Sequence, residues 1–275
     1  MKRRVWQEIS GKKVPELPER GRKRSMEESE AFMYTCLMQW IGSVMGGGRN
    51  MKIDRKIMTL YAVTDRRWLK PGENLAKPVE ELLRAGVTCV QLREKAADDR
   101  LFLEEARQLK KLCSRYQTPL IINDRPDIAK MAGADGVHVG LSDMGIEKAR
   151  AFLGEGSIIG GSVHNVKEAL AAQEAGADYL GCGAVFGSST KTDTTAISYE
   201  ELKDICQAVE IPVVAIGGIH RGNVKNLAGS GVDGIAVISA LFEKEDKASA
   251  ARELLELSIC LRNGRTYQSD SVGGR

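Results

Sequence analysis

The chain has 275 residues, enough for one large domain or two ordinary ones. Charged residues make up 28% and hydrophobic residues 43%, the ordinary balance of a soluble globular protein. The net charge of +3 arises in residues 1–50, which hold ten basic and six acidic residues, whereas the remainder has a net charge of −1. The body of the chain therefore gives no reason to expect a nucleic-acid partner.

The first fifty residues differ from the rest. They begin charged and interrupted by proline, which indicates disorder, while residues 31–48 are uncharged and predict at most one short helix. Acidic residues just before this apolar part, and Gln39 within it, argue against a signal peptide or a membrane anchor. We expect residues 1–50 to be a flexible or partly helical N-terminal extension, residues 51–262 to be the catalytic domain and residues 263–275 to be a flexible tail.

Beyond residue 58, short apolar runs alternate with longer amphipathic segments. Eight runs are short and rich in Val and Ile, which predicts buried parallel strands separated by helices. The clearest helix covers residues 98–116, where Leu101, Glu105, Leu109 and Leu112 mark its faces. The predicted strands are residues 59–64, 88–92, 119–123, 135–139, 157–161, 179–186, 212–217 and 234–239.

A repeated turn precedes every second predicted strand. The segments AGVTCV, AGADGV, AGADYL and SGVDGI each contain a glycine that ends a helix just before the next strand. These glycines are about two β-α units apart. Eight units of this period predict a closed (β/α)8 TIM barrel, an α/β fold in a single domain. An open doubly wound sheet is disfavoured because no G-x-G-x-x-G follows the first strand.

The cysteines and histidines show no metal-site spacing. The six cysteines lack a short C-x-x-C pairing and several lie in apolar runs, as expected for buried free thiols in a reducing compartment. We therefore expect a cytoplasmic protein. His138 lies within the fourth strand and is interpreted as a satisfied interior histidine rather than a base, and His164 and His220 as solvated or helix-capping.

In a (β/α)8 barrel the active site lies where the strands end, so the residues after each strand are the candidates. Arg93 and Lys95 alternate after the second strand and can face the barrel mouth together. Asn123 and Asp124 follow the third strand and Asp143 follows the fourth. Two carboxylates from adjacent strands can share one hard cation, most simply Mg²⁺. The alternatives are a solvated strand end for the cations and helix capping for each aspartate.

Later strand ends favour phosphate binding. The segment GAVFGSSTKTDTT, residues 183–195, surrounds Lys191 with hydroxyl groups, a composition that suits phosphate but also occurs in solvated loops. Gly217 and Gly218 follow the seventh strand and Ser239 follows the eighth, the usual position of a phosphate site in such barrels. The residues alone thus predict two anionic subsites and a transferase that handles phosphorylated small molecules.

The motifs LYAVTDR, QLREK, NDR, ADGVHVG, ADYLG, GAVFGSSTK and AIGGI resemble those of the thiamine-phosphate synthase family over residues 58–258. The resemblance implies a (β/α)8-barrel transferase that joins hydroxymethylpyrimidine diphosphate to thiazole phosphate, releasing pyrophosphate and giving thiamine monophosphate. It also implies Mg²⁺ as the cofactor and these small molecules as the partners, without nucleic acid or membrane. The sequence leaves a homo-oligomer open.

The resemblance assigns site residues position by position. It implies that Arg93, Lys95 and Lys191 are catalytic and that Asp124 and Asp143 hold Mg²⁺. It implies pyrimidine diphosphate binding by Gln91, Leu92, Arg93, Glu94, Lys95, Asn123, Ser162 and Lys191. It implies thiazole phosphate binding by Ser188, Ser189, Thr190, Gly218, Ile238 and Ser239. Two positions depart from the family: Gly187-Ser188 replaces Pro-Thr after the sixth strand, and Leu141 replaces a glutamine.

The implied reaction is dissociative. In the family, the pyrimidine's methylene–oxygen bond breaks first and gives a carbocation stabilised by its amino group, so the protein mainly holds the departing pyrophosphate. No strong base is needed, because the thiazole nitrogen is already nucleophilic. Two alternatives are a paralogous thiazole tautomerase, which would not need QLREK or the aspartate pair, and a non-catalytic thiamine-phosphate binding protein.

Overall fold

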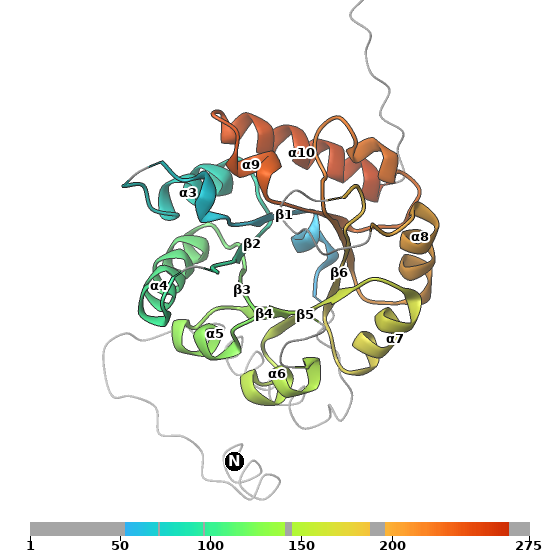
Figure 1. Cartoon of the computed structure of the whole chain (residues 1–275), viewed down its shortest axis with the longest axis horizontal. Helices are drawn as coiled ribbons and strands as arrows, with labels where there is room; N and C mark the ends of the chain where they lie inside the picture. Colours follow the sequence, from blue (N-terminus) through green and yellow to red (C-terminus); the bar gives the residue numbers. More distant parts are fainter. Residues whose placement is uncertain (1–52, 71, 96, 141–144, 188–195, 264–275) are drawn as a thin grey trace, which may run out of the picture. The chain divides into compact units, whose positions relative to one another are not determined.

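A computed structural model describes residues 53–70, 72–95, 97–140, 145–187 and 196–263. Its eight parallel strands pair in chain order and the last pairs with the first, so they close into a barrel (Figure 1). This confirms the predicted (β/α)8 fold. The strands are β1 Leu60–Val63, β2 Cys89–Leu92, β3 Leu120–Asn123, β4 Gly136–Val139, β5 Ile158–Val163, β6 Tyr179–Gly183, β7 Val213–Ile216 and β8 Gly234–Val237.

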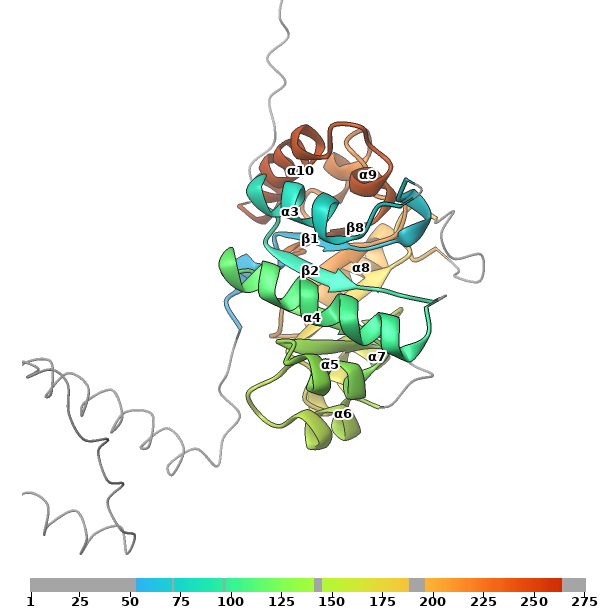
Figure 2. The same ribbon diagram turned by 90° about the vertical axis from the view of Figure 1, so that its left-hand side faces the viewer.

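Helices lie outside the strands and cover the barrel (Figures 1 and 2). The predicted helix over residues 98–116 is observed at Asp99–Arg115, and the Asp98 side chain caps it by accepting from Leu101 N at 2.8 Å. The α-helices are α3 Ala76–Arg84, α4 Asp99–Arg115, α5 Pro126–Ala132, α6 Ile146–Leu153, α7 Val166–Glu174, α8 Tyr199–Ala208, α9 Ser239–Phe242 and α10 Lys247–Arg262. The 3-10 helices are η1 Arg55–Met58, η2 Arg66–Trp68 and η3 Val224–Leu227.

The seventh unit departs from the regular alternation, because β7 is followed by the 3-10 helix η3 and not by an α-helix. Its connection, residues 217–233, contains Gly217, Gly218, Gly222, Gly229 and Gly231. Glycine lowers helix stability by about 1 kcal/mol relative to alanine. A full α-helix is therefore disfavoured in this connection, and the chain returns to β8 through a shorter element.

The repeated turns found in the sequence have one structural role. In each, the residue just before the even-numbered strand accepts a hydrogen bond from an amide near the start of the preceding strand, at 2.7–2.9 Å. Three of these residues are aspartates that also form ion pairs of 2.6–2.7 Å with a basic side chain. The amide–acceptor pairs are Leu60–Thr88, Leu120–Asp135, Ile159–Asp178 and Val213–Asp233. The repeat therefore joins neighbouring strands at the amino-terminal end of the barrel.

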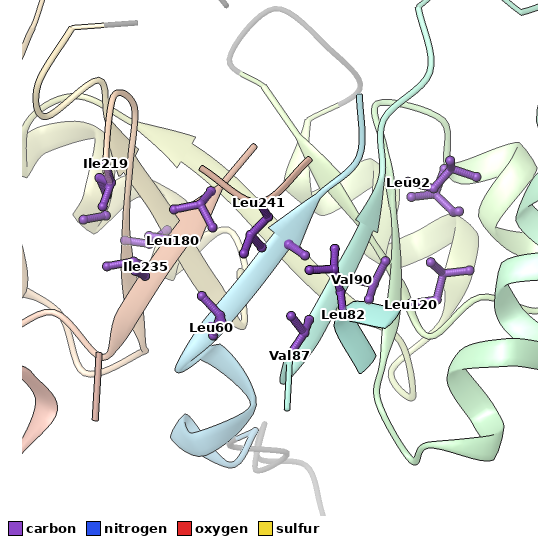
Figure 3. Packing of buried hydrophobic residues seen from close by; sticks show 14 of the residues in the cluster. Leu60, Leu82, Val87, Val90, Leu92, Leu120, Leu180, Ile219, Ile235 and Leu241 are labelled. Carbon is purple, nitrogen blue, oxygen red and sulfur yellow. The ribbon is translucent and has the colours of Figure 1, made fainter. Parts of the chain in front are cut away.

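Buried apolar residues form two clusters, because successive side chains of a strand point to opposite faces. The larger cluster fills the space between strands and helices and includes Val90 and Leu92 of β2 (Figure 3). The smaller one lies inside the barrel and includes Cys89 of β2 and the tyrosines Tyr61 and Tyr179. Gln91 lies between Val90 and Leu92 along β2, so its side chain points to the opposite face, into the interior of the barrel.

The cysteines of the described residues are free thiols, as predicted, and Cys89, Cys113 and Cys182 are buried. Burial raises the pKa of the Cys113 thiol to about 12, so this thiol stays protonated at neutral pH. None of the helices in the described part of the chain has the length and apolar character needed to cross a membrane. The predicted extension and tail fall almost entirely outside the described residues and stay predictions.

Candidate active site

The strands run in one direction, so their carboxyl ends meet at one end of the barrel (Figure 2). At the end of β2, Gln91 is buried at 5% exposure. Beyond the strand, the Arg93 amide donates to Thr64 Oγ1 at 3.0 Å, so the segment after β1 holds the continuation of β2 in place. Arg93 is half-buried and Lys95 is exposed. The two predicted cations therefore follow β2 at the barrel mouth.

The two other residues of QLREK have different surroundings. Leu92 is fully buried in the outer cluster, so its side chain contributes to the core (Figure 3). The Glu94 side chain is 3% exposed and accepts from Arg66 Nε at 2.7 Å. Arg66 also pairs with Glu105 of α4, whose Oε2 is buried without a hydrogen-bond partner. Burial raises the pKa of Glu105 above its usual range, although the Arg66 charge opposes the shift.

A further carboxylate lies just after β1. Asp65 is 4% exposed, caps η2 and makes a bidentate ion pair with Arg67. Burial raises the pKa of Asp65, but the hydrogen bonds of Arg67 and the charges of Arg67 and Arg93 outweigh it, so the pKa lies below its usual range. Asp65 therefore stays ionised beside Arg93 at neutral pH.

The end of β3 presents an amide and a carboxylate together. Asn123 Nδ2 donates to Asp124 Oδ2 at 2.5 Å, and the Asp124 amide donates to the backbone oxygen of His138 on β4 at 2.8 Å. Asp124 has φ 63°, the left-handed region that non-glycine residues seldom occupy. Helix α5 has Arg125 as its N-cap residue, and the Arg125 side chain makes no capping hydrogen bond. The N-cap position of α5 thus belongs to Arg125, and a capping role for the Asp124 side chain stays an untested alternative.

Ser162 lies on β5, half-buried, with its Oγ 3.0 Å from His138 Nε2. His138 Nδ1 in turn lies 2.9 Å from the Tyr179 hydroxyl. His138 is thus hydrogen-bonded through both ring nitrogens inside the barrel, as its interpretation as a satisfied interior histidine predicted. Tyr61 and Tyr179 are not among the residues predicted from the sequence, although the alternation of side chains along β1 and β6 places both inside the barrel.

The last strand ends bring the remaining candidates together. Gly218 follows β7 with φ 66°, and a Cβ atom there would lie 2.2 Å from the backbone oxygen of Gly187. Only glycine therefore lets this turn contact the start of the segment after β6. Ile238 packs against the interior cluster, and Ser239 begins α9 after β8; both are half-buried.

The structure does not describe every predicted site residue. Ser188, Ser189, Thr190 and Lys191, which follow β6, lie outside the described residues, as do Asp143 and Leu141 after β4. Within the described ranges, no group of three or more His, Cys, Asp or Glu side chains forms a metal cluster. The described candidates come from β2, β3, β5, β7 and β8 and from the segments that follow them.

A closed parallel barrel with cations, an amide and a carboxylate at its carboxyl-terminal end defines an enzyme of the (β/α)8-barrel class. Residues 60–241 match the TMP-TENI family model, thiamine monophosphate synthase. The chain belongs to this family, which confirms the resemblance inferred from its motifs.

Named relatives extend over the same region. The chain is 50% identical over 198 residues to a thiamine-phosphate synthase of Clostridium acetobutylicum, covering 72% of this chain and 93% of the relative. It is 48% identical over 196 residues to the thiamine-phosphate synthase of Clostridium tetani, covering 71% and 93%. Among solved structures, the thiamine phosphate pyrophosphorylase of Pyrococcus furiosus matches with a TM-score of 0.69 and 41% identity, covering 75% of this chain and 98% of that one.

Proposed function

We propose that this protein is a thiamine-phosphate synthase. It joins 4-amino-2-methyl-5-hydroxymethylpyrimidine diphosphate to thiazole phosphate and forms thiamine monophosphate and pyrophosphate. Support comes from the family, from relatives of that name at about half identity, and from the transferase chemistry that the strand ends suit. The observation that carries the proposal is the presence of Gln91, Arg93, Lys95, Asn123 and Asp124 at one end of the barrel.

Cations at the mouth would hold the leaving group. Arg93 and Lys95 after β2, together with Lys191, would bind the diphosphate and stabilise the negative charge that develops when the methylene–oxygen bond breaks. The thiazole nitrogen then attacks the pyrimidine methylene carbon, and the electron pair of the broken bond leaves with pyrophosphate. Arg93 is half-buried, so its charge acts with less screening than a fully solvated one.

The residues fit a magnesium ion. Asp124 offers carboxylate oxygen, the ligand type that Mg²⁺ prefers, and it follows β3 with a left-handed backbone that non-glycine residues seldom occupy. With Asp143 it would hold an ion that neutralises charge on the diphosphate. Asn123, bonded to Asp124 at 2.5 Å, would fix the orientation of that carboxylate.

The second substrate would bind on the other side of the mouth. Backbone groups at Gly218, the start of α9 at Ser239 and the hydroxyls of Ser188, Ser189 and Thr190 would bind the thiazole phosphate, with Ile238 against the ring. Holding the thiazole by its phosphate supplies proximity, and excluding water protects the cation from hydrolysis. We also propose that the enzyme is cytoplasmic, because the cysteines of the described residues are free thiols, as expected in a reducing compartment.

A pyrophosphate-release assay tests the proposal. Purified protein is given the pyrimidine diphosphate, with and without thiazole phosphate and with and without Mg²⁺. Release that requires both additions, with thiamine phosphate appearing in equal amount, is the expected result. If no pyrophosphate or thiamine phosphate forms, the thiazole tautomerase or the binding protein becomes the better assignment. The retained Arg93, Lys95 and Asp124, which a tautomerase would not need, favour the synthase.

A further inference from the structure

An unbroken chain of hydrogen bonds crosses the interior of the barrel. Gln91 Nε2 donates to the Tyr61 hydroxyl at 2.9 Å, and the Tyr61 and Tyr179 hydroxyls lie 2.8 Å apart. Tyr179 lies 2.9 Å from His138 Nδ1, and His138 Nε2 lies 3.0 Å from Ser162 Oγ. The chain begins and ends on two residues assigned to the pyrimidine diphosphate, on β2 and β5, and its three middle members are not assigned to any ligand.

The middle of this chain lies in an apolar environment. Tyr61 and Tyr179 are 1% and 0% exposed and belong to the interior cluster with Met58, Ile121 and Val214. Placing a hydroxyl among such neighbours costs free energy unless it is hydrogen-bonded, and a phenylalanine of the same shape would avoid that cost. The hydrogen bonds of Tyr61 and Tyr179 offset this cost, so the two hydroxyls depend on one another and on the groups at the ends of the chain.

The backbone is shaped around the chain as well. A Cβ atom on Gly160 would lie 2.4 Å from the Tyr179 hydroxyl oxygen and 2.5 Å from His138 Nδ1. A Cβ atom on Gly181 would lie 3.1 Å from the His138 ring. Glycines on β5 and β6 thus provide the space that the tyrosine and the histidine occupy together.

The chain has a direction, because each phenol carries a single proton. Burial raises the pKa of both tyrosines well above the usual value, so both stay protonated. The Gln91 amide nitrogen can only donate, so Tyr61 accepts from it and donates to Tyr179, which donates to His138 Nδ1. His138 then carries its proton on Nε2 and donates it to Ser162. The amide oxygen of Gln91 and the hydroxyl proton of Ser162 form the two ends of the chain.

We infer that Tyr61, Tyr179 and His138 are positioning residues, which couple Gln91 to Ser162 and set one as acceptor and the other as donor toward the pyrimidine diphosphate. The inference rests on the proposed function. A pyrimidine with an amino group and ring nitrogens presents both donors and acceptors, so reversing the chain would present the wrong group at each end. In such a network the hydrogen bonds polarise one another, so the effects of removing two members are not additive and a double-mutant cycle measures their coupling.

A double-mutant cycle tests the coupling. Tyr179→Phe removes one hydroxyl from the middle, and Ser162→Ala removes the far end; each single variant and the double variant are assayed for kcat and for KM of both substrates. We expect Tyr179→Phe to lower kcat/KM for the pyrimidine diphosphate by about tenfold while KM for thiazole phosphate is unchanged, with the double variant losing markedly less than the product of the single losses. Tyr116→Phe, which removes a hydroxyl bonded to Glu80 on the outside of the barrel, is the matched control.

Additive losses, or an unchanged kcat/KM in a Tyr179→Phe variant that is only less stable, would overturn the inference. Should that variant not fold, Tyr61→Phe breaks the next link and replaces it in the cycle. Nitrogen-15 NMR of the imidazoles, of which the chain has three, gives a readout without turnover: His138 should carry its proton on Nε2, and a proton on Nδ1 would contradict the direction. If the wild-type protein shows no turnover, the proposed function is refuted instead. The protonation state of the His138 ring nitrogens would then still test the direction of the hydrogen-bond chain.

Discussion

Arg66 Nε lies 2.7 Å from Glu94 Oε2, and the same guanidinium also donates to Glu105 on α4. Glu94 is the residue between the two cations Arg93 and Lys95. Because its side chain is only 3% exposed and held by Arg66, the acidic member of the R-E-K segment is fixed within the protein while the cations on either side remain half-buried or exposed. By pairing with Glu94, Arg66 helps to leave the positive charges of Arg93 and Lys95 available at the mouth.

Replacing this arginine should weaken both stability and substrate binding. Arg66→Ala removes the positive charge that pairs with the buried carboxylates of Glu94 and Glu105, and we expect the free energy of unfolding to fall by about 2–3 kcal/mol. KM for the pyrimidine diphosphate should rise as the R-E-K segment loses its anchor. Urea denaturation and steady-state kinetics measure the two effects. The control is Arg84→Ala, which removes an exposed i,i+4 pair with Glu80 and should change stability far less. Equal effects of the two substitutions would contradict this role.

Glu105 should make stability depend on pH. Its pKa is raised in the folded protein, mainly by burial, so the folded state binds the proton more tightly than the unfolded state. This contribution to stability is fully present below the ordinary glutamate pKa of 4.5 and is lost as the pH rises through the folded value. In Glu105→Gln the group does not titrate, so the variant should gain stability relative to wild type as the pH increases above 4.5. Denaturation curves over this range measure the difference, and a difference that does not change with pH would refute the assignment.

Lys191 should be needed for turnover and not for folding. Its charge is assigned to the leaving pyrophosphate, so we expect Lys191→Ala to lower kcat by about 10²–10³-fold, the usual effect of removing one such electrostatic group. The unfolding midpoint should stay at the wild-type value. Lys203→Ala, an exposed lysine on α8, is the control. Unchanged turnover in Lys191→Ala would count against the synthase assignment itself.

Asp124 should set the magnesium requirement. Asp124→Asn keeps the shape of the side chain but removes a charged ligand, so the Mg²⁺ concentration for half-maximal activity should rise by about tenfold or more. Activity measured against Mg²⁺ concentration checks this. Asp127→Asn alters a carboxylate paired with Arg125 at the start of α5 and should leave the magnesium curve in place. If both variants follow the wild-type curve, Asp124 does not hold the metal.

Gly160 should tolerate no side chain. A Cβ atom there would lie 2.2 Å from the ring of Tyr179, which is fully buried and unable to move aside. We expect Gly160→Ala to destabilise the fold by about 2–3 kcal/mol through overpacking. Gly156→Ala, at a position with nothing within 4 Å, is the matched control. Thermal unfolding compares them, and equal midpoints would show that the interior can expand at Gly160.

Much of the fold could be predicted because local features carry it. Strands such as β3 and β8 are short apolar runs between amphipathic segments. The AGAD-type turns mark every second unit, because each turn both follows a helix and accepts a hydrogen bond from the neighbouring strand. The connection after β7 forms the 3-10 helix η3 in place of an α-helix, and its glycines disfavour a longer helix. The strand ends also placed Arg93, Asn123 and Asp124 at one mouth, because all parallel strands of a barrel end on the same side.

The sequence by itself determined the order of the strands, the closure of the barrel and the identity of the polar residues at its mouth, because each of these follows from a local period repeated along the chain. Only the tertiary structure decided which side chains meet. Tyr61 and Tyr179 are 118 residues apart yet share a hydrogen bond, and Glu94 pairs with Arg66 of a different unit. These pairings depend on the direction in which each side chain leaves its strand and on the diameter of the closed barrel, two quantities set by the strands jointly and by no single segment.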